Sequence, residues 1–185
     1  MGDVIDRDGF RANVGIVLMQ DDGRLFIGRR SGGRGWQFPQ GGMQRGETAE
    51  DALFRELCEE IGLQRDDVEI AGQTQGWLRY RLPGRYQRRD SRPRCIGQKQ
   101  RWYLLRLKRA DPQFRFDTAG EPEFDRWRWV DYWQPVREVI YFKRTVYTRA
   151  LHELGAQVFP KGLPPYPDWW HVDEKKDGDA DAEAS

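Results

Sequence analysis

The sequence of 185 residues predicts an α/β fold in which a mixed β-sheet lies between helices. Segments rich in β-branched, aliphatic and aromatic residues recur along the chain and are typical of strands. Two other segments, at 48–61 and from residue 142 onward, repeat their apolar residues at helical spacing. Strands and helices in this order suit a sheet that carries helices on both faces.

The N-terminal part is predicted to form a β-hairpin followed by a loop. Residues 11–20 are mainly β-branched and aliphatic, and the turn signal Asp22-Gly23 leads into a second strand at 24–30. The segment 31–42 is rich in glycine and contains a proline. We therefore expect a loop without regular structure there.

A helix is predicted over residues 48–61. Thr48 is a suitable N-cap, and Glu50 and Asp51 lie in the first turn, where the helix dipole favours acidic side chains. Gly62 marks the C-terminal end. The helix is thus expected to follow a glycine-rich loop and to lead into a second loop.

Three glutamates share one face of this helix. At 100° per residue and with Glu56 at zero, Glu59 lies at about 300° and Glu60 at about 40°. Carboxylates at this spacing repel one another, so we expect a positive charge between them, for which a divalent cation is one candidate. The alternative is a solvated acidic face. Apolar residues occupy the neighbouring face, at about 60–140°, namely Leu53, Leu57 and Ile61.

Further strands and a second helix are predicted in the rest of the chain. The segments with strand character are 68–75, 76–82, 98–108 and 126–130. A long polar loop begins at Pro83. From Phe142 the apolar residues recur at helical spacing until Gly155, which we expect to end a helix packed over the sheet.

The composition indicates a soluble protein without a membrane segment. A third of the residues are charged, and the apolar run at 14–19 is far shorter than the roughly 20 residues of a membrane span. Cys58 and Cys95 show no metal-ligand spacing, and we expect both to be reduced, which favours a cytoplasmic location. His152 and His171 are isolated in the sequence, and we expect neither to be a ligand or a catalytic group.

The net charge of +1 conceals a basic body and an acidic tail. Residues 173–185 hold six acids and two lysines, a charge of −4, so the preceding chain carries +5. Within 79–109, twelve Lys and Arg residues face a single acid, Asp90, and alternate with aromatic residues. This pattern favours binding to a polyanion.

We expect one folded domain at 6–160, because a chain of this length supports a single core of ordinary size. The segment 161–172 is rich in proline and tryptophan and is expected to form an irregular arm. The acidic segment 173–185 is expected to be disordered.

The segment 41–63 carries a dense motif, G-x5-E-x7-R-E-U-x-E-E-x-G-U, where U is aliphatic. The residues at its fixed positions are Gly41, Glu47, Arg55, Glu56, Leu57, Glu59, Glu60, Gly62 and Leu63. The motif is identified as a Nudix box, and the chain therefore resembles the Nudix hydrolases. The resemblance implies an α/β/α sandwich that hydrolyses a diphosphate linkage between a nucleoside and another group. It also implies a divalent metal cofactor, Mg²⁺ or Mn²⁺.

The resemblance also implies roles for residues of the box. Glu56, Glu59 and Glu60 are expected to be catalytic and to hold the metal ion, with Gly41 as part of the metal site. Arg55 is expected to be catalytic by orienting these carboxylates through ionic hydrogen bonds. Glu47 is expected to support them structurally.

Outside the box, Glu123 resembles a residue that completes the metal site in bacterial RNA pyrophosphohydrolases. Its alternative role is that of a solvated acid in an acidic loop. The general base is drawn from the box in some Nudix members and from a loop in others, and both origins remain open here.

The chain resembles the bacterial RNA pyrophosphohydrolases over residues 8–155, through segments such as FRANVGIV, WQFPQGG, CIGQKQRWYLL and PEFDRWRWV. Such enzymes remove pyrophosphate from the 5′ triphosphate end of RNA, and ribonucleases attack the resulting monophosphate more readily. By position, Arg30 and Lys143 are expected to contact the 5′ phosphates, Arg11 the RNA, and Phe142 a base. The alternatives are solvated cations and a core phenylalanine.

Two other functions are compatible with the sequence. A dinucleoside polyphosphate hydrolase cleaves a similar anhydride, and Tyr80 is then a candidate for stacking on a base. A non-catalytic RNA-binding module retains only the fold, but the complete set of glutamates argues against it.

Overall fold

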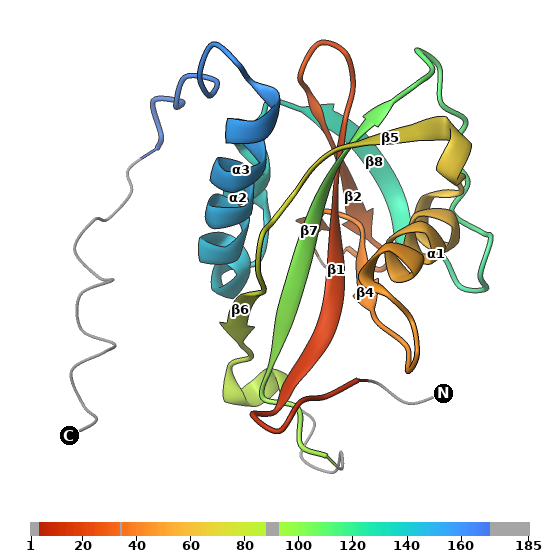
Figure 1. Ribbon diagram of the computed structural model, residues 1–185, viewed down its shortest axis with the longest axis vertical. Coiled ribbons are helices and arrows are strands. Elements are labelled where there is room, and N and C mark those ends of the chain that lie inside the picture. The colour runs from red at the N-terminus through yellow and green to blue at the C-terminus, as the bar shows by residue number, and fades with distance from the viewer. Residues whose placement is uncertain (1–3, 34, 88–92, 171–185) are drawn as a thin grey trace.

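The computed structural model describes residues 4–33, 35–87 and 93–170 (Figure 1). The N-terminal half contains the strands β1 (Phe10–Met19), β2 (Leu25–Arg30), β3 (Trp36–Gln37) and β4 (Gln40–Gly42) and the helix α1 (Ala49–Ile61). The remaining strands are β5 (Val68–Gln73), β6 (Leu78–Arg81), β7 (Gly97–Leu107) and β8 (Phe124–Val130). The remaining α-helices are α2 (Gln134–Glu138) and α3 (Arg144–Val158), and single 3₁₀ turns lie at Arg65–Asp67, Gly84–Tyr86 and Tyr141–Lys143.

The strands of the described chain form one mixed sheet with the central order β3-β2-β1-β7-β5. Strands β1 and β7 run parallel along their length, from Phe10 opposite Gly97 to Met19 opposite Arg106. The other pairs are antiparallel, with β8 on β2 and β6 on β7. Helix α1 lies on one side of the sheet and α2 with α3 on the other (Figure 1). The predicted α/β/α sandwich with a mixed sheet is therefore confirmed.

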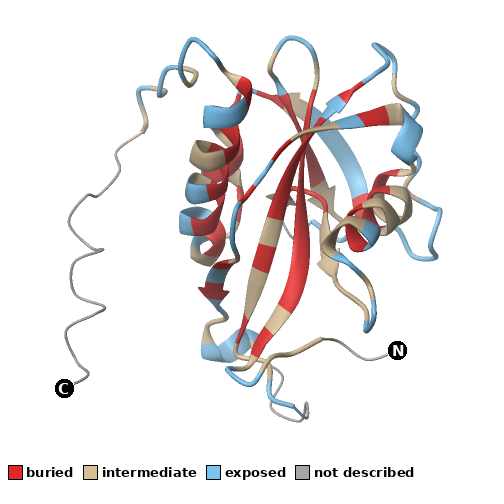
Figure 2. Ribbon diagram, in the orientation of Figure 1, coloured by how far each residue is buried: buried red, intermediate tan, exposed pale blue. Residues whose placement is uncertain are grey.

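Strand β1 is buried on both faces, because each face of the sheet carries a helical layer (Figure 2). Val14, Ile16 and Leu18 pack into the cluster under α1, whereas Val17 and Met19 pack into the cluster under α3. This alternation follows the two-residue period of a strand. The long apolar segment near the N-terminus thus supplies both cores.

Helix α1 begins and ends where the sequence predicts. The Thr48 hydroxyl accepts a hydrogen bond from the Asp51 backbone N–H, and the Asp51 carboxylate accepts one from the Thr48 backbone N–H. Gly62 adopts a left-handed conformation, with φ of 75°, that terminates the helix. The predicted apolar face is fully buried and consists of Leu53, Leu57 and Ile61.

The prediction that Gly155 ends the C-terminal helix was wrong. Helix α3 continues to Val158, and Gly155 is buried within it. A side chain at this position would come within 2.3 Å of Leu163 and 2.6 Å of the Tyr132 hydroxyl. Glycine is therefore present for close packing, not to end the helix. Phe142, the predicted start, instead lies in the 3₁₀ turn that precedes α3.

The predicted loop at 31–42 contains two short strands. Gly28 pairs with Gln37 in β3, and Val14 pairs with Gly41 in β4. The predicted hairpin forms, but β1 and β2 pair only next to the turn, at Met19 and Leu25. The segment 36–42 therefore occupies the space between the far halves of these strands. Helix α2 was not predicted from the sequence.

The described part of the proline- and tryptophan-rich segment after Lys161 contains no helix or strand and packs on the domain. Trp133 donates a hydrogen bond through Nε1 to the Pro164 carbonyl at 2.9 Å. Tyr166 and Trp170 stack on each other with ring centroids 5.1 Å apart. Residues 171 and 172 of the arm and the acidic segment 173–185 lie outside the described residues.

Cys58 and Cys95 are both free thiols, as the sequence predicts. Among the helices of the described residues, none combines the length and apolarity that a membrane crossing requires.

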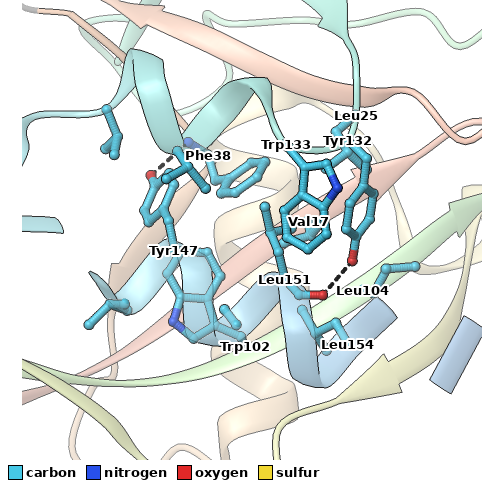
Figure 3. Packing of buried hydrophobic residues seen from close by; sticks show 14 of the residues in the cluster. Val17, Leu25, Phe38, Trp102, Leu104, Tyr132, Trp133, Tyr147, Leu151 and Leu154 are labelled. Carbon is cyan, nitrogen blue, oxygen red and sulfur yellow. Dashed lines mark hydrogen bonds between the residues drawn. The ribbon is translucent and has the colours of Figure 1, made fainter. Parts of the chain in front are cut away.

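A buried hydrogen bond fixes the segment 36–42 to helix α3 (Figure 3). The Phe38 backbone N–H donates to the Tyr147 hydroxyl at 3.0 Å, and the two rings stack with centroids 4.8 Å apart. Both side chains are fully buried. We therefore expect Tyr147→Phe to lower the free energy of unfolding by about 1–3 kcal/mol, because it leaves a buried N–H without an acceptor.

Chemical denaturation measures this loss, and Tyr132→Phe is the matched comparison. The Tyr132 hydroxyl is also buried, and it donates to the Leu151 carbonyl at 2.6 Å. That carbonyl lies inside α3 and keeps a helical hydrogen bond when the hydroxyl is removed. A smaller loss is expected for Tyr132→Phe, and a larger one would contradict this account.

Candidate active site

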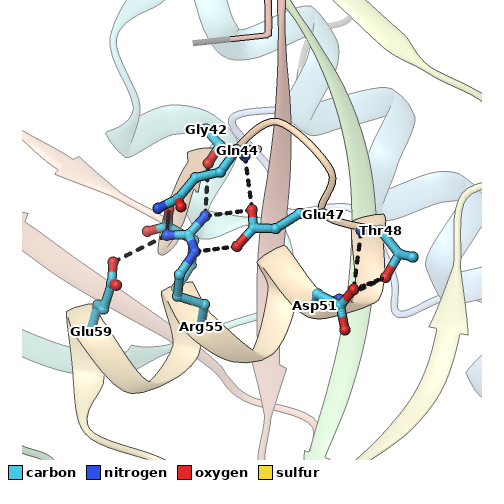
Figure 4. Close-up of polar contacts among 8 residues, drawn as sticks. Gly42, Gln44, Glu47, Thr48, Asp51, Arg55 and Glu59 are labelled. Carbon is cyan, nitrogen blue, oxygen red and sulfur yellow. Dashed lines mark hydrogen bonds and ion pairs between the residues drawn. The ribbon is translucent and has the colours of Figure 1, made fainter. Parts of the chain in front are cut away.

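Arg55 joins the glycine-rich loop to the acidic face of α1 (Figure 4). Its guanidinium donates to both carboxylate oxygens of Glu47, at 2.6 and 3.0 Å, and to the Gly42 carbonyl at 2.8 Å. Its Nη1 also donates to Glu56 at 2.7 Å and to Glu59 at 3.1 Å. A single cation thus holds three carboxylates and the loop backbone in fixed positions.

The charges in this network perturb one another. The hydrogen bond from Arg55 lowers the pKa of Glu47, and a backbone N–H from Gln44 adds to this effect. The same pairing raises the pKa of Arg55 above its ordinary value. The positive charge predicted between the glutamates is therefore supplied, for Glu56 and Glu59, by the protein itself.

Gly41 allows the loop to approach Glu56 closely. A Cβ atom at this position would lie 1.8 Å from the Glu56 carboxylate carbon, which is far inside van der Waals contact. The adjacent Gly42 makes similar room for Arg11, whose Nη2 would lie 2.3 Å from a Cβ atom there. A side chain at either glycine would therefore displace the neighbouring charged group from its present position.

A pocket of about 740 Å³ opens beside this network. It is lined by residues from β1, β2, α1, the segment before β8 and the turn before α3. The structure brings most of the predicted site residues to this pocket, namely Arg11, Arg30, Gly41, Glu56, Glu60, Glu123, Phe142 and Lys143. Arg55 and Glu59 are not among the lining residues, but Arg55 hydrogen-bonds to Glu59 and to Glu56, which lines the pocket.

One wall of the pocket is acidic. Burial raises the pKa of Glu60 well above its ordinary value, and the negative charges of Glu56 and Glu123 raise it further. Burial also raises the pKa of Glu56, although Arg55 opposes this shift. The charges of Glu56 and Glu123 therefore disfavour the charged form of Glu60, at an energetic cost that a bound cation would relieve.

These carboxylates do not form a closed cluster in the structure. Among the described residues, no three Asp, Glu, His or Cys side chains lie close enough together to hold a metal ion. Two arginines account for this spacing, since Arg55 pairs with Glu56 and Arg30 pairs with Glu123 at 3.0 Å. Glu60 accepts a hydrogen bond from the Gln40 backbone N–H at 2.9 Å. The donor set fits a hard cation such as Mg²⁺, which prefers carboxylate oxygens.

Another part of the pocket wall is cationic. Lys143 is 8% exposed, and its Nζ donates to the side-chain oxygens of Gln37 and Gln40, each at 3.3 Å. Burial lowers the pKa of Lys143 to about 8, the nearby charge of Arg30 lowers it too, and Glu123 and Glu60 oppose the shift. Lys143 therefore remains mostly protonated at pH 7, beside the acidic wall.

Aromatic rings border the pocket on the same side as Lys143. Phe142 is half-buried, and its ring lies 5.9 Å from that of Tyr80. Tyr80 is buried, and its hydroxyl donates to the Gln98 side chain at 2.6 Å. Phe142 and Tyr80 therefore both line the pocket, and Phe142 also packs against the hydrophobic cluster under α3.

Several polar lining residues were missed in the sequence. Gln37, Gln40 and Gln98 line the pocket, and Asn13 lies among them in the apolar strand β1. The Asn13 side-chain oxygen is buried and has no hydrogen-bond partner within the described residues. Asn13 could have been recognised from the sequence, because a polar residue inside a buried strand normally requires a hydrogen-bond partner.

The family model described as NUDIX domain matches residues 9–151. With the box, the sandwich and the acidic pocket in place, the chain belongs to the Nudix family. An RNA pyrophosphohydrolase of Alkalilimnicola ehrlichii is 60% identical over 164 residues, which are 89% of this chain and 91% of the relative. One of Pseudomonas putida is 57% identical over 158 residues, which are 85% of this chain and 99% of the relative.

Solved structures show the same fold at much lower sequence identity. The E. coli dihydroneopterin triphosphate pyrophosphohydrolase superimposes with a TM-score of 0.61 at 20% identity, over 79% of this chain and 96% of that structure. A C. elegans Ap4A hydrolase binary complex gives a TM-score of 0.56 at 18% identity, over 75% and 92% of the two chains. These similarities establish the architecture of the sandwich.

The close approach of Gly41 to Glu56 leads to a prediction about catalysis. Gly41→Ala is expected to lower kcat/KM about 100-fold, because the added methyl group displaces the Glu56 carboxylate by an ångström or more. Hydrolysis of a triphosphorylated substrate under steady-state conditions measures this loss. Gly76→Ala is the control, since a Cβ atom there meets no atom within 4 Å. Equal activity of the two variants would contradict the proposed constraint.

Proposed function

We propose that this protein removes pyrophosphate from the 5′ end of triphosphorylated RNA and leaves a 5′-monophosphate. The observation that carries the proposal is a single pocket that is lined by carboxylates, by cationic side chains and by an aromatic ring. A polyphosphate chain requires both walls, because its oxygens bind to Lys and Arg and also share a divalent cation with carboxylates. The relatives named RNA pyrophosphohydrolase, at 55–60% identity, support the same substrate.

Glu56, Glu59, Glu60 and Glu123 are the residues that we propose hold a divalent cation, Mg²⁺ or Mn²⁺. Their oxygen-only donor set and the mutual repulsion of Glu60, Glu56 and Glu123 support this assignment. When bound, such an ion neutralises phosphate oxygens and lowers the pKa of water. Gly41 provides the space in which Glu56 reaches the pocket.

Arg55 orients the acidic wall in this proposal. Its bidentate contact with Glu47 fixes the guanidinium, and the remaining Nη1 hydrogens hold Glu56 and Glu59. The carboxylates are therefore held in position before substrate binds, which reduces the reorganisation that the reaction requires.

The cationic wall is proposed to hold the 5′ phosphates. Lys143 reaches the pocket from a buried position, and its charge is favoured further when phosphate oxygens approach. Arg30 also lines the pocket, in an ion pair with Glu123. A phosphate would provide Arg30 with a second acceptor. Phosphate binding would therefore favour the release of Glu123 toward a cation.

The RNA chain is proposed to leave the pocket past Phe142 and Arg11. Phe142 offers the ring on which an unpaired base can stack, and Arg11 lies over Gly42 at the opposite rim. The basic segment 79–109 adds sequence-independent attraction for the phosphate backbone. We place this reaction in the cytoplasm, where triphosphorylated transcripts are made, and in a catalytic domain at 6–160.

Substrate choice is tested by a direct comparison. With Mg²⁺ present, we expect kcat/KM for a triphosphorylated RNA to exceed that for diadenosine tetraphosphate by at least about tenfold, since a base stack and backbone contacts favour the RNA. Release of pyrophosphate and of the monophosphorylated product is measured in parallel reactions. A large preference for the dinucleotide would instead establish the dinucleoside polyphosphate hydrolase. Binding of RNA without turnover would indicate a non-catalytic module.

The assigned carboxylates are tested by Glu59→Gln. The substitution keeps the shape of the side chain but removes its charge, so we expect kcat to fall about 100-fold and the fold to be retained. Glu50→Gln on the same helix is the matched control, because Glu50 pairs only with Arg65 among the described residues and lies away from the pocket. Unchanged turnover in Glu59→Gln would refute its role.

A further inference from the structure

Two large aromatic side chains are exposed next to the pocket. Tyr86 is 43% exposed and Tyr141 is 51% exposed, although the described chain exposes few other large apolar side chains. Tyr86 lines the pocket, and Tyr141 directly precedes Phe142 in the chain. Exposed rings that adjoin a binding site indicate an additional contact surface.

Both rings pack against Phe142. The centroid of the Phe142 ring lies 5.1 Å from that of Tyr86 and 5.4 Å from that of Tyr141. The two tyrosines come from different parts of the chain, the turns Gly84–Tyr86 and Tyr141–Lys143. The fold therefore assembles three rings at the rim of the pocket from two distant segments.

Arg85 joins the two tyrosines. Its guanidinium lies 5.0 Å from the ring centroid of Tyr86 and 5.9 Å from that of Tyr141. Its Nη2 also donates to the Tyr141 hydroxyl at 3.4 Å. The cluster thus combines partly exposed aromatic rings with a positive charge, a combination that suits a nucleotide base and its phosphate.

Exposure increases stepwise along three successive residues. Lys143 is buried in the pocket, Phe142 is half-buried at its rim, and Tyr141 is exposed outside it. A chain that leaves the pocket at Lys143 therefore meets Phe142 first and Tyr141 next. This order is the one in which consecutive nucleotides of a single strand would pass.

We propose that Arg85, Tyr86 and Tyr141 form a stacking platform for an unpaired RNA base that follows the base on Phe142. The inference rests on the proposed function and extends it from the 5′ phosphates to the adjoining RNA. Base stacking on aromatic rings tolerates any sequence, since every base has a π-face. The platform therefore selects single-stranded 5′ ends of sufficient length, not a particular sequence.

Synthetic 5′-triphosphorylated RNAs of two to five nucleotides provide the test. We expect kcat/KM to rise about fivefold to tenfold at the single added nucleotide whose base reaches the platform. Replacing that nucleotide by an abasic one is expected to abolish the rise. A smooth increase with length, or a rise that survives the abasic substitution, would overturn the proposal because backbone contacts alone would explain it.

Variants assign the effect to the platform. In Tyr141→Ala the ratio of kcat/KM between the longer and the shorter RNA is expected to fall toward one, whereas Tyr141→Phe, which keeps the ring, retains the ratio. Tyr166→Ala is the control, because Tyr166 is 50% exposed but lies on the C-terminal arm beside His152. A ratio in Tyr141→Ala equal to that of the unmodified protein would contradict the platform.

The same RNAs distinguish a failure of the proposed pyrophosphohydrolase function from a failure of the platform. In that case none of the RNAs releases pyrophosphate, whatever its length. The fluorescence anisotropy of the same RNAs then measures their affinity, and the platform still predicts a stepwise gain that the abasic nucleotide and Tyr141→Ala remove. Equal affinity for all lengths would reject the platform independently of turnover.

Discussion

The contacts of the Arg55 guanidinium determine how the other charged groups of the site are arranged. This side chain satisfies both oxygens of Glu47, the carbonyl of Gly42 and two glutamates of α1. Without a cation at this point, the glutamates would repel one another and the loop would lose the hydrogen bond that ties the Gly42 carbonyl to the helix. A planar donor with several N–H groups is required, because lysine cannot present them in a fixed geometry.

The pocket collects both acidic and cationic side chains because elements from both faces of the sheet reach it. The acidic wall comes mainly from a helix on one face of the sheet, whereas Lys143 comes from the turn before a helix on the other face. Burial disfavours the charged forms of both Glu60 and Lys143, because it raises the pKa of Glu60 and lowers that of Lys143. Each charged group is partly stabilised by the other, and a substrate with phosphates and a cation complements both.

Local features of the fold could be predicted from the sequence. The ends of α1 depend on Thr48 and Gly62, whose effects are confined to neighbouring backbone groups. The glutamates on its face follow from helical geometry alone. Gly155 was misread because its role depends on Tyr132 and Leu163, which are distant in the sequence.

Tertiary features of the site could not be predicted in the same way. The strands β3 and β4 have two and three residues, too few to show a period, and so Gln37 and Gln40 were not recognised as lining residues. Resemblance to relatives indicated Lys143, but its burial arises from packing between segments about a hundred residues apart. The ion pair of Arg30 with Glu123 likewise appears only when β2 and the chain before β8 come together.

Because β1 and β2 pair only over a short stretch, the two ends of this hairpin tolerate insertions differently. These strands meet only near Met19 and Leu25, and the segment 36–42 separates their other ends. The turn between them lies far from the pocket, so an added residue there shifts little. A residue added within 36–42 must shift the register of β3 or β4, and one register step turns every side chain to the opposite face of a strand. The two ends of one hairpin therefore differ in evolutionary freedom, with the distal turn open to insertion and the end at the pocket constrained in length.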